Sequence, residues 1–186
     1  MTIKPELLET LRQKRQHLLQ TTTPEKLEAL HAKGALSARE RLMTLFDQDT
    51  FQETGLYARH RAQYFGMKGR DLPTDGVITG TGYVGGKQVS SFSQDFSVLA
   101  GTLGKMHAQK IVGAMQYAAK IGVPMVAFQD SGGARIQEGV DALSGYGQVF
   151  YNNVLLSGVV PQIAVICGPC AGGAAYSPAL MDFIIM

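Results

Sequence analysis

Residues 123–139 read VPMVAFQDSGGARIQEG and residues 162–173 read QIAVICGPCAGG. Each stretch is a short apolar run that ends in a glycine-rich turn, and each turn leads into a helix-like segment. Glycine permits positive φ and lets another group approach the backbone closely. The first N–H groups of a helix have no intrahelical partner and carry partial positive charge. Two such turns side by side would offer backbone donors to one developing negative oxygen, which is the chemistry of an oxyanion hole.

The elements around these turns predict an α/β fold. Strands are expected over 77–84, 88–92, 123–128 and 162–167, with Gly85-Gly86 as a hairpin turn between the first two. Helices are expected over 103–120 and 137–157, the second interrupted at Gly145 and Gly147, and a short helix follows Gly173. Strand, turn and helix repeated in this order predict a parallel sheet with right-handed crossovers. Ligands bind at the carboxyl ends of such strands, where both turns fall.

The first part of the chain predicts a helical arm. Helices are expected over 4–20 and 24–32, and Ser37 to Glu40 form a capping box that begins a third helix. We expect residues 1–46 to be this arm and residues 47–186 to be the main domain, with a loop over 55–74. The last apolar run, 182–186, has no polar finish, so the domain is expected to be incomplete at its C-terminus.

Composition excludes several classes of protein. The chain has 186 residues, 45% hydrophobic and 17% charged, which indicates a globular protein. A net charge of +2 is too small to predict nucleic-acid binding. No apolar run is long enough for a transmembrane helix, and no secretory signal is expected. Two cysteines do not make a disulfide framework, so a cytoplasmic setting is expected.

Charge is also unevenly distributed along the sequence. No Lys or Arg follows Arg135. We expect that stretch to be buried, either within the fold or within an oligomer. Basic residues gather instead in the first 41 positions and in the loop from Arg59 to Arg70. That loop is expected to be solvated, although contact with ligand phosphates remains an alternative.

Several motifs suggest other chemistry and carry less weight. Cys167-Gly168-Pro169-Cys170 matches a thioredoxin-type CxxC, but Ala171-Gly172-Gly173 delays the helix, so two buried cysteines lining a strand end are favoured. Ser131 follows a strand as a nucleophile would, yet no histidine has an obvious carboxylate partner. The GxGxxG spacing at 80–85 lies inside the hairpin, where no helix follows it. Neither turn contains a Walker sequence, and no metal-ligand spacing is present.

Two other residues have open interpretations. His107 lies in the helix predicted over 103–120 and is expected to be a structural or surface residue. Arg135 comes directly after the first turn, where it would anchor that loop through Glu138 or Asp130.

At these residues the chain resembles a known family. The segments DSGGARIQEGV (130–140), SGVVPQI (157–163) and GPCAGGAAYSPAL (168–180) resemble the carboxyltransferase β subunit of biotin-dependent acyl-CoA carboxylases, of the propionyl-CoA carboxylase type. The resemblance extends upstream through SARERL (37–42), TDGVITG (74–80) and FSQDF (92–96), in register from about residue 31.

The resemblance implies a fold and a reaction. The family has two crotonase-like domains, of which this chain resembles the first, the acyl-CoA-binding one. The reaction moves a carboxyl group from carboxybiotin to the α-carbon of a short acyl-CoA such as propionyl-CoA. Biotin would be carried on a partner, a biotin carboxylase or biotin carrier subunit, and the intact protein would be a homo-oligomer. Such an enzyme is not expected to bind nucleic acid or membranes.

The resemblance also assigns roles to residues. Gly172 and Gly173 match the oxyanion pair for the acyl thioester and are the catalytic candidates. Ser131, Gly132, Gly133 and Ala134 are expected to line the other side of the pocket, by analogy with the crotonase fold. Close helix–strand packing is the alternative explanation for Gly172-Gly173. No side-chain base stands out, which agrees with a family in which carboxybiotin takes the α-proton.

Other functions remain open at this point. The chain also resembles a subunit that runs the reaction in reverse, a biotin-dependent decarboxylase acting for example on methylmalonyl-CoA. A non-catalytic acyl-CoA-binding or assembly module is a third alternative. We expect residues 1–186 alone to be inactive. The sequence does not determine acyl-chain length, because one methylene is worth only about 1–3 kcal/mol.

Overall fold

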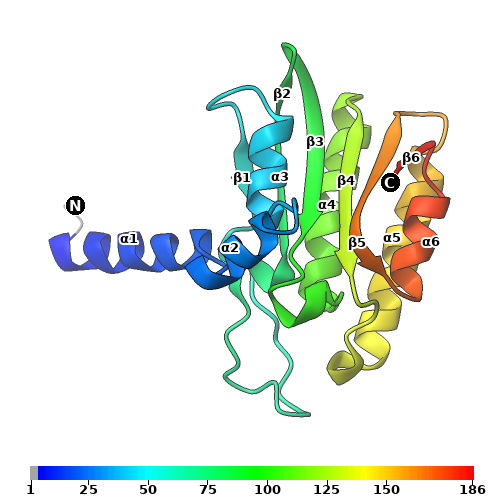
Figure 1. Cartoon of the computed structure of the whole chain (residues 1–186). Helices are drawn as coiled ribbons and strands as arrows, with labels where there is room; N and C mark the ends of the chain where they lie inside the picture. The colour runs from blue at the N-terminus through cyan, green and yellow to red at the C-terminus, as the bar shows by residue number, and fades with distance from the viewer. Residues whose placement is uncertain (1–3) are drawn as a thin grey trace.

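A computed structural model describes residues 4–186, whose strands form one six-stranded sheet (Figure 1). The strands lie in sequence order, β1-β2-β3-β4-β5-β6. The pairs β1–β2 and β2–β3 are antiparallel, and β3 to β6 run parallel. The strand bounds are β1 Gln52–Thr54, β2 Val77–Val84, β3 Lys87–Gln94, β4 Met125–Ser131, β5 Gln162–Cys170 and β6 Phe183–Ile185.

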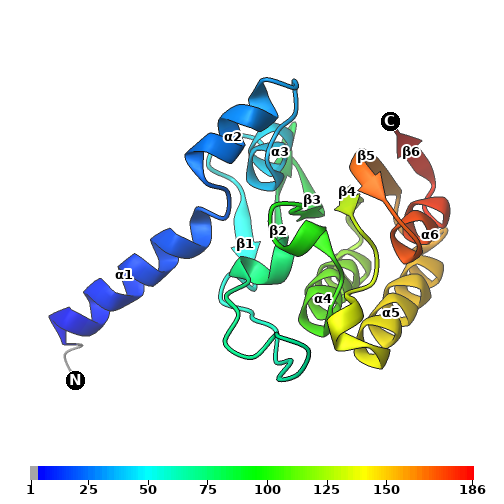
Figure 2. The same cartoon turned by 60° about the horizontal axis from the view of Figure 1, so that its bottom comes forward.

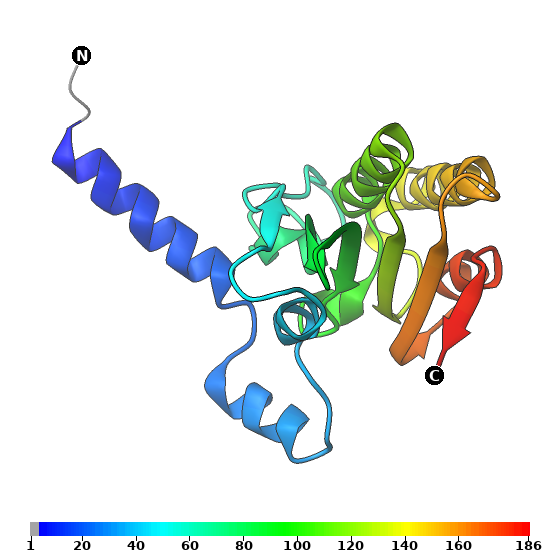
Figure 3. The same ribbon diagram turned by 90° about the horizontal axis from the view of Figure 1, so that it is seen from above.

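The helices lie on both faces of this sheet (Figures 2 and 3). Helices α4, α5 and α6 cover one face, whereas α3 packs on the other face against β2 and β3. The helix bounds are α1 Pro5–Leu19, α2 Pro24–His31, α3 Ala38–Leu45, α4 Lys105–Ile121, α5 Val140–Leu156 and α6 Gly173–Ala179. Short 3-10 helices span Pro73–Gly76, Leu99–Gly101 and Ile136–Glu138.

The predicted parallel sheet and the predicted hairpin are both present, so the sheet is mixed. The hairpin turn at Gly85-Gly86 connects β2 to β3, and both amides donate to Asp47. Strand β1 was not predicted, because only three residues pair at this edge of the sheet. The GxGxxG spacing lies in β2 and its turn, as expected, where Gly82 faces the Phe46 ring.

One apolar layer lies on each face of the sheet. The larger lies between the sheet and α4 and α5, with Phe92, Ile111 and Met125 fully buried in it. The smaller lies on the opposite face, where Leu42 and Phe46 contact β2 and β3. The predicted capping box at Ser37 and Glu40 begins α3. The boundary at residue 46 stays a prediction, although α3 shares this core with the sheet.

The predicted interruption of α5 is wrong. The helix runs unbroken through Gly145 and Gly147. A Cβ at Gly145 would lie 2.8 Å from the Cβ of Ala108 on α4. The glycine therefore permits close approach of α5 to α4 rather than a break.

The N-terminal helices extend away from the sheet. Figures 1 and 3 show α1 projecting from the body of the molecule. Leu7 and Leu11 are exposed on it, while Leu18, near its end, is fully buried. No helix within residues 4–186 is long and apolar enough to span a bilayer.

The charge-poor last part of the chain is only partly covered by its own fold. Along α5 a row of apolar side chains is between 62% and 80% exposed, namely Val140, Leu143, Tyr151 and Val154. Of the two expectations, burial within this fold does not hold for these residues. Burial within an oligomer stays a prediction.

Candidate functional site

The two glycine-rich turns lie side by side at the carboxyl ends of β4 and β5. Ser131 pairs with Cys170, and the Ala171 N–H donates to the Ser131 carbonyl at 3.1 Å. A Cβ at Gly133 would lie 2.7 Å from the Ala171 carbonyl oxygen. The glycine therefore allows the two backbones to approach closely.

The amides of these turns divide into two groups. Gly132 N–H donates to the Ala100 carbonyl at 2.8 Å, and Gly133 N–H to the Ser131 hydroxyl at 3.1 Å. Within residues 4–186, the amides of Ala134, Gly172 and Gly173 have no hydrogen-bond partner. Unpaired amides at a partly exposed turn are available to a ligand oxygen.

Neighbouring bonds fix the direction of the Ala134 amide. Leu103 N–H donates to the Gly133 carbonyl at 2.9 Å, and Arg135 N–H donates to the Leu103 carbonyl at 3.0 Å. This is a parallel bridge between Leu103 and Ala134. Because the flanking groups bond Leu103, the N–H of Ala134 itself points away from that residue.

Gly172 and Gly173 are glycines for different reasons. Gly172 precedes α6 with φ 54° and ψ −121°, a conformation that side chains disfavour, although a Cβ there would meet nothing within 4 Å. Gly173 is the first residue of α6, where a Cβ would lie 2.8 Å from the Tyr146 ring. The close contact at Gly173 is therefore between helices α6 and α5, and not the helix–strand packing expected as the alternative explanation. Within residues 4–186 it leaves the Gly173 amide without a partner.

Behind the first turn lies a buried group of three charges. Arg135 and Asp75 have no exposed side-chain surface, and their charged groups are 2.6 Å apart. The same Arg135 nitrogen lies 2.8 Å from Glu138. The expected anchor through Glu138 is therefore present. The other expected anchor, Asp130, pairs instead with Arg41 at 2.7 Å.

The two carboxylates also cap helix α4. Lys105 N–H donates to Glu138 and His107 N–H donates to Asp75, both at 2.8 Å. These are amides of the first turn of α4, which have no intrahelical partner. The arginine thus lies between two carboxylates that satisfy the positive end of the helix.

His107 belongs to this buried network and is structural, as expected. Its Nδ1 lies 2.9 Å from the Asp75 carbonyl oxygen, and its Nε2 lies 3.3 Å from the Gln94 amide nitrogen. A carbonyl only accepts, so Nδ1 carries the proton and Nε2 accepts from Gln94. Burial, with the nearby Arg135 charge, holds the pKa of His107 well below its usual value.

The Ser131 hydroxyl bonds two backbone groups, which does not favour a role as nucleophile. It donates to the Gly101 carbonyl at 2.7 Å and accepts from the Gly133 amide. Among the described residues, no imidazole bonds it, because His17, His31 and His60 each contact another group. Within residues 4–186 the buried hydroxyl of the neighbouring Tyr146 has no hydrogen-bond partner, and burial raises the pKa of Tyr146 to about 12.

The CxxC cysteines lie at the end of β5, the arrangement favoured above. Both are free thiols, and Cys167 and Cys170 are only partly buried, so the predicted position is right and the predicted full burial is wrong. Burial raises the pKa of both, which disfavours the reactive thiolate. Within residues 4–186 no cluster of metal-ligating side chains was found.

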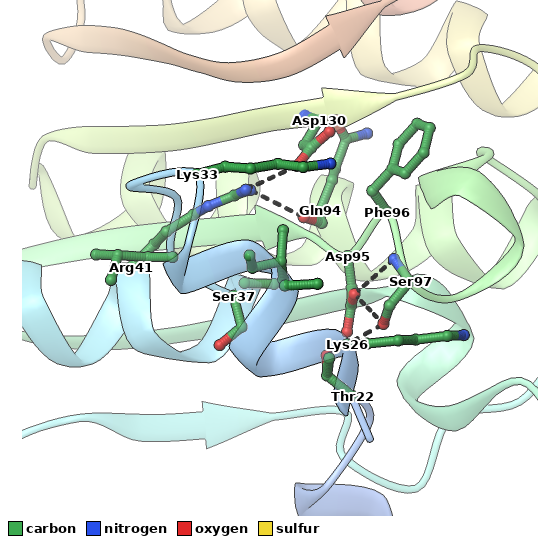
Figure 4. A pocket seen from close by; sticks show the side chains of 14 residues that line it. Thr22, Lys26, Lys33, Ser37, Arg41, Gln94, Asp95, Phe96, Ser97 and Asp130 are labelled. Carbon is green, nitrogen blue, oxygen red and sulfur yellow. Dashed lines mark hydrogen bonds and ion pairs between the residues drawn. The ribbon is translucent and has the colours of Figure 1, made fainter. Parts of the chain in front are cut away.

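A cavity of about 340 Å³ lies beside the turns, between the helical arm and the ends of β3 and β4. Figure 4 shows Lys26 and Lys33 bordering it, with Phe96 nearby. Asp95 accepts from the Thr21 and Ser97 hydroxyls, both at 2.5 Å, and Asp130 pairs with Arg41. Within the described chain, neither lysine has an ion-pair partner.

Sequence reasoning did not find this cavity or the role of Asp75. The cavity depends on where the helical arm lies, which no local pattern encodes. Asp75 lies 60 positions before Arg135, in a 3-10 turn where Thr74 and Asp75 have positive φ. Its one local signal was the TDGVITG segment.

Comparison with known proteins places this geometry in a family. Residues 29–186 match the model of the carboxyl transferase domain. The methylmalonyl-CoA decarboxylase subunit alpha of Propionigenium modestum is 53% identical over 186 residues, which are 100% of this chain and 36% of that protein. The propionyl-CoA carboxylase beta chain of Cereibacter sphaeroides is 52% identical over 161 residues, 87% of this chain and 32% of the relative.

A solved structure agrees with the whole chain. The transcarboxylase 12S crystal structure, described as a hexamer assembly with methylmalonyl-coenzyme A bound, has a TM-score of 0.95 and 49% identity. It is covered over 36% of its length, and this chain over 100%. The chain spans about a third of the length of the curated relatives it matches. The fold is crotonase-like, as the resemblance implied.

Proposed function

Because this chain belongs to the carboxyl transferase domain family, we propose that it supplies the acyl-CoA side of a biotin-dependent carboxyltransferase. The reaction moves a carboxyl group from carboxybiotin to the α-carbon of a short acyl-CoA such as propionyl-CoA. The observation that supports this most directly is the pair of adjacent turns, in which the amides of Ala134, Gly172 and Gly173 have no partner among residues 4–186.

These amides suit the thioester oxygen. Removing the α-proton of an acyl-CoA moves negative charge onto that oxygen, and fixed N–H donors stabilise the charge without reorganisation. Gly172 and Gly173 lie at the start of α6, where the helix adds partial positive charge. Ala134 would donate from the opposite turn, while Ser131, Gly132 and Gly133 line that side and hold its backbone.

The proton acceptor is expected to come from outside this chain. Around the turns, within residues 4–186, His107 is fully buried and Asp130 is paired with Arg41. The raised pKa values of Cys167 and Cys170 keep both thiols protonated at neutral pH, so neither can accept the proton. This fits a partner that carries biotin, because carboxybiotin supplies both the carboxyl group and a base when it is bound.

The cavity beside the turns suits the nucleotide end of coenzyme A. Its volume falls within the range of about 300–1,000 Å³ usual for ligand pockets. Lys26 and Lys33 would meet phosphate groups, and the Phe96 ring, 43% exposed, offers a stacking surface for adenine. Asp130, which lines the cavity, directly precedes Ser131, so the cavity lies next to the first turn.

Self-association and location complete the proposal. The exposed apolar row on α5 supports a homo-oligomer, and the hexamer described for transcarboxylase 12S is the precedent. The two free cysteines support a reducing, cytoplasmic location.

Calorimetric titration of residues 1–186 with propionyl-CoA tests the proposal. We expect saturable binding at one site, and tighter binding than for coenzyme A without an acyl group, because only the thioester presents a carbonyl to the amides. Absence of binding, or equal affinity for both ligands, would contradict the proposal.

A decarboxylase subunit acting on methylmalonyl-CoA is the second candidate. The identity of 53% over the whole chain with such a subunit favours it. Both reactions use the same thioester enolate, so residues 1–186 would act alike in each. Assay of the complete protein with its biotin-bearing partner, in both directions, separates the two.

A further inference from the structure

We propose that Arg135 is a positioning residue, which together with Asp75 and Glu138 sets the direction of the Ala134 amide toward the thioester oxygen. This inference rests on the proposed function, because it assigns Ala134 a ligand. It concerns side chains that never touch the ligand and act through the backbone.

The Arg135 guanidinium bonds the backbone segment that pairs with the turn containing Ala134. Besides its ion pairs, Arg135 donates to the Thr102 carbonyl at 2.8 Å and to the Asp75 carbonyl at 3.3 Å. Thr102 precedes Leu103, the residue that bonds both neighbours of Ala134. The same side chain therefore fixes the turn at its own position and fixes the strip of backbone paired with it.

The two carboxylates join this clamp to helix α4. Glu138 accepts from the Lys105 amide and Asp75 from the His107 amide, so α4 and the turn cannot shift independently. At Gly104 an added Cβ would lie 2.5 Å from Arg135 and 2.7 Å from the Glu138 carboxyl carbon. Arg135 and Glu138 are therefore closely packed against Gly104. Such packing limits movement of the turn and would keep the Ala134 amide in a fixed direction.

An ordinary structural ion pair offers the matched control. Arg39 pairs with Glu53 at 2.8 Å on the other side of the sheet and is mostly buried. Lysine at either position keeps the charge but loses the planar fork that bonds several acceptors at once. Arg135→Lys and Arg39→Lys therefore differ mainly in whether the turn is affected.

The infrared band of a bound thioester gives a readout that stability alone would not move. Propionyl-CoA carrying ¹³C at its thioester carbonyl is bound to residues 1–186, and the carbonyl band is compared with that of the free ligand. Donors to this oxygen polarise the bond and shift the band to lower wavenumber. We expect this shift in the unsubstituted chain and in Arg39→Lys.

In Arg135→Lys we expect at least half of the shift to be lost, with the dissociation constant for unacylated coenzyme A changed less than about twofold. Glu138→Gln, which keeps the shape of the side chain, should lose part of the shift and serves if Arg135→Lys fails to fold. A full shift in either folded variant overturns the positioning role alone. Absence of any shift in the unsubstituted chain overturns the proposed function together with it.

Discussion

Arg135 and Asp75 form an ion pair of 2.6 Å in which neither side chain is exposed to solvent. Sixty positions separate them in the sequence, yet the pair links the turn after β4 to the first turn of α4. A buried charge without a partner is strongly destabilising to the folded state. Removing either Arg135 or Asp75 would leave the other in that position.

We therefore expect Arg135→Met to destabilise the chain by about 3–5 kcal/mol, because two buried carboxylates lose their counter-charge. Arg39→Met, which leaves a less buried Glu53, should cost less. Urea unfolding of both variants measures the difference. Equal losses would show that burial of the Arg135 group does not carry the stability assigned to it.

Gly173 is expected to be irreplaceable because of the Tyr146 ring. In Gly173→Ala the new methyl would lie 2.8 to 2.9 Å from three ring carbons, so either α6 or α5 must move. Tyr146→Ala removes the three ring carbons that the new methyl would meet and should relieve the clash. The two substitutions together should cost less than the sum of their separate effects, measured as free energies of unfolding. Strict additivity would exclude the contact as the cause.

Stability should fall as pH is lowered through the range of an ordinary histidine. The pKa of His107 is held well below 6.5, so below that pH the unfolded chain takes up a proton that the folded chain does not. The loss approaches about 1.4 kcal/mol per pH unit below 6.5 until the folded value is reached. Between pH 7.5 and 5.5 the free energy of unfolding, measured with urea, should fall more steeply with decreasing pH in the unsubstituted chain than in His107→Gln. Parallel curves would contradict the buried neutral imidazole.

Lys26 and Lys33 are expected to bind phosphate groups of coenzyme A. Replacing either by Ala should weaken coenzyme A binding about three- to tenfold, in line with about 1 kcal/mol for a partly exposed ion pair. Lys87→Ala, in an exposed strand end, is the control. Calorimetry with coenzyme A and with its form lacking the 3′-phosphate shows which phosphate each lysine meets. An unchanged affinity in both lysine variants would place the nucleotide elsewhere.

The exposed apolar row on α5 is expected to mediate self-association. Leu143→Glu and Val154→Glu put charges on this row and should lower the molar mass measured by light scattering. Met43→Glu, at an exposed apolar residue of α3 on the opposite face, should leave that mass unchanged. A monomeric unsubstituted chain, or equal masses for all variants, would remove α5 as the interface.

Local patterns predicted the parts of this molecule that depend on local physics. The capping box at Ser37 and the hairpin at Gly85-Gly86 need only neighbouring residues, so the sequence was sufficient there. The side-by-side placement of the two turns followed from parallel strand topology. The amides of Gly132 and Gly133, in contrast, are used inside the fold.

The remaining features depend on contacts between distant segments. Gly145 was predicted to interrupt its helix, whereas in the structure it lets that helix approach Ala108 closely. Asp75 and the arm cavity need the packing of residues far apart in sequence. The roles of Ala134, Gly172 and Gly173 stay predictions, because they depend on a bound thioester.

The last strand bears on how this polypeptide behaves at high concentration. Within residues 4–186, strand β6 pairs with β5 alone, and its Phe183, Ile184 and Ile185 side chains are each at least half exposed. The outer edge of β6 presents backbone N–H and C=O groups that pair with no strand among residues 4–186, and apolar side chains flank them. Another extended segment can pair with such an edge. We expect low protein concentration, or the substitution Ile184→Lys, to reduce aggregation of the polypeptide through this edge strand.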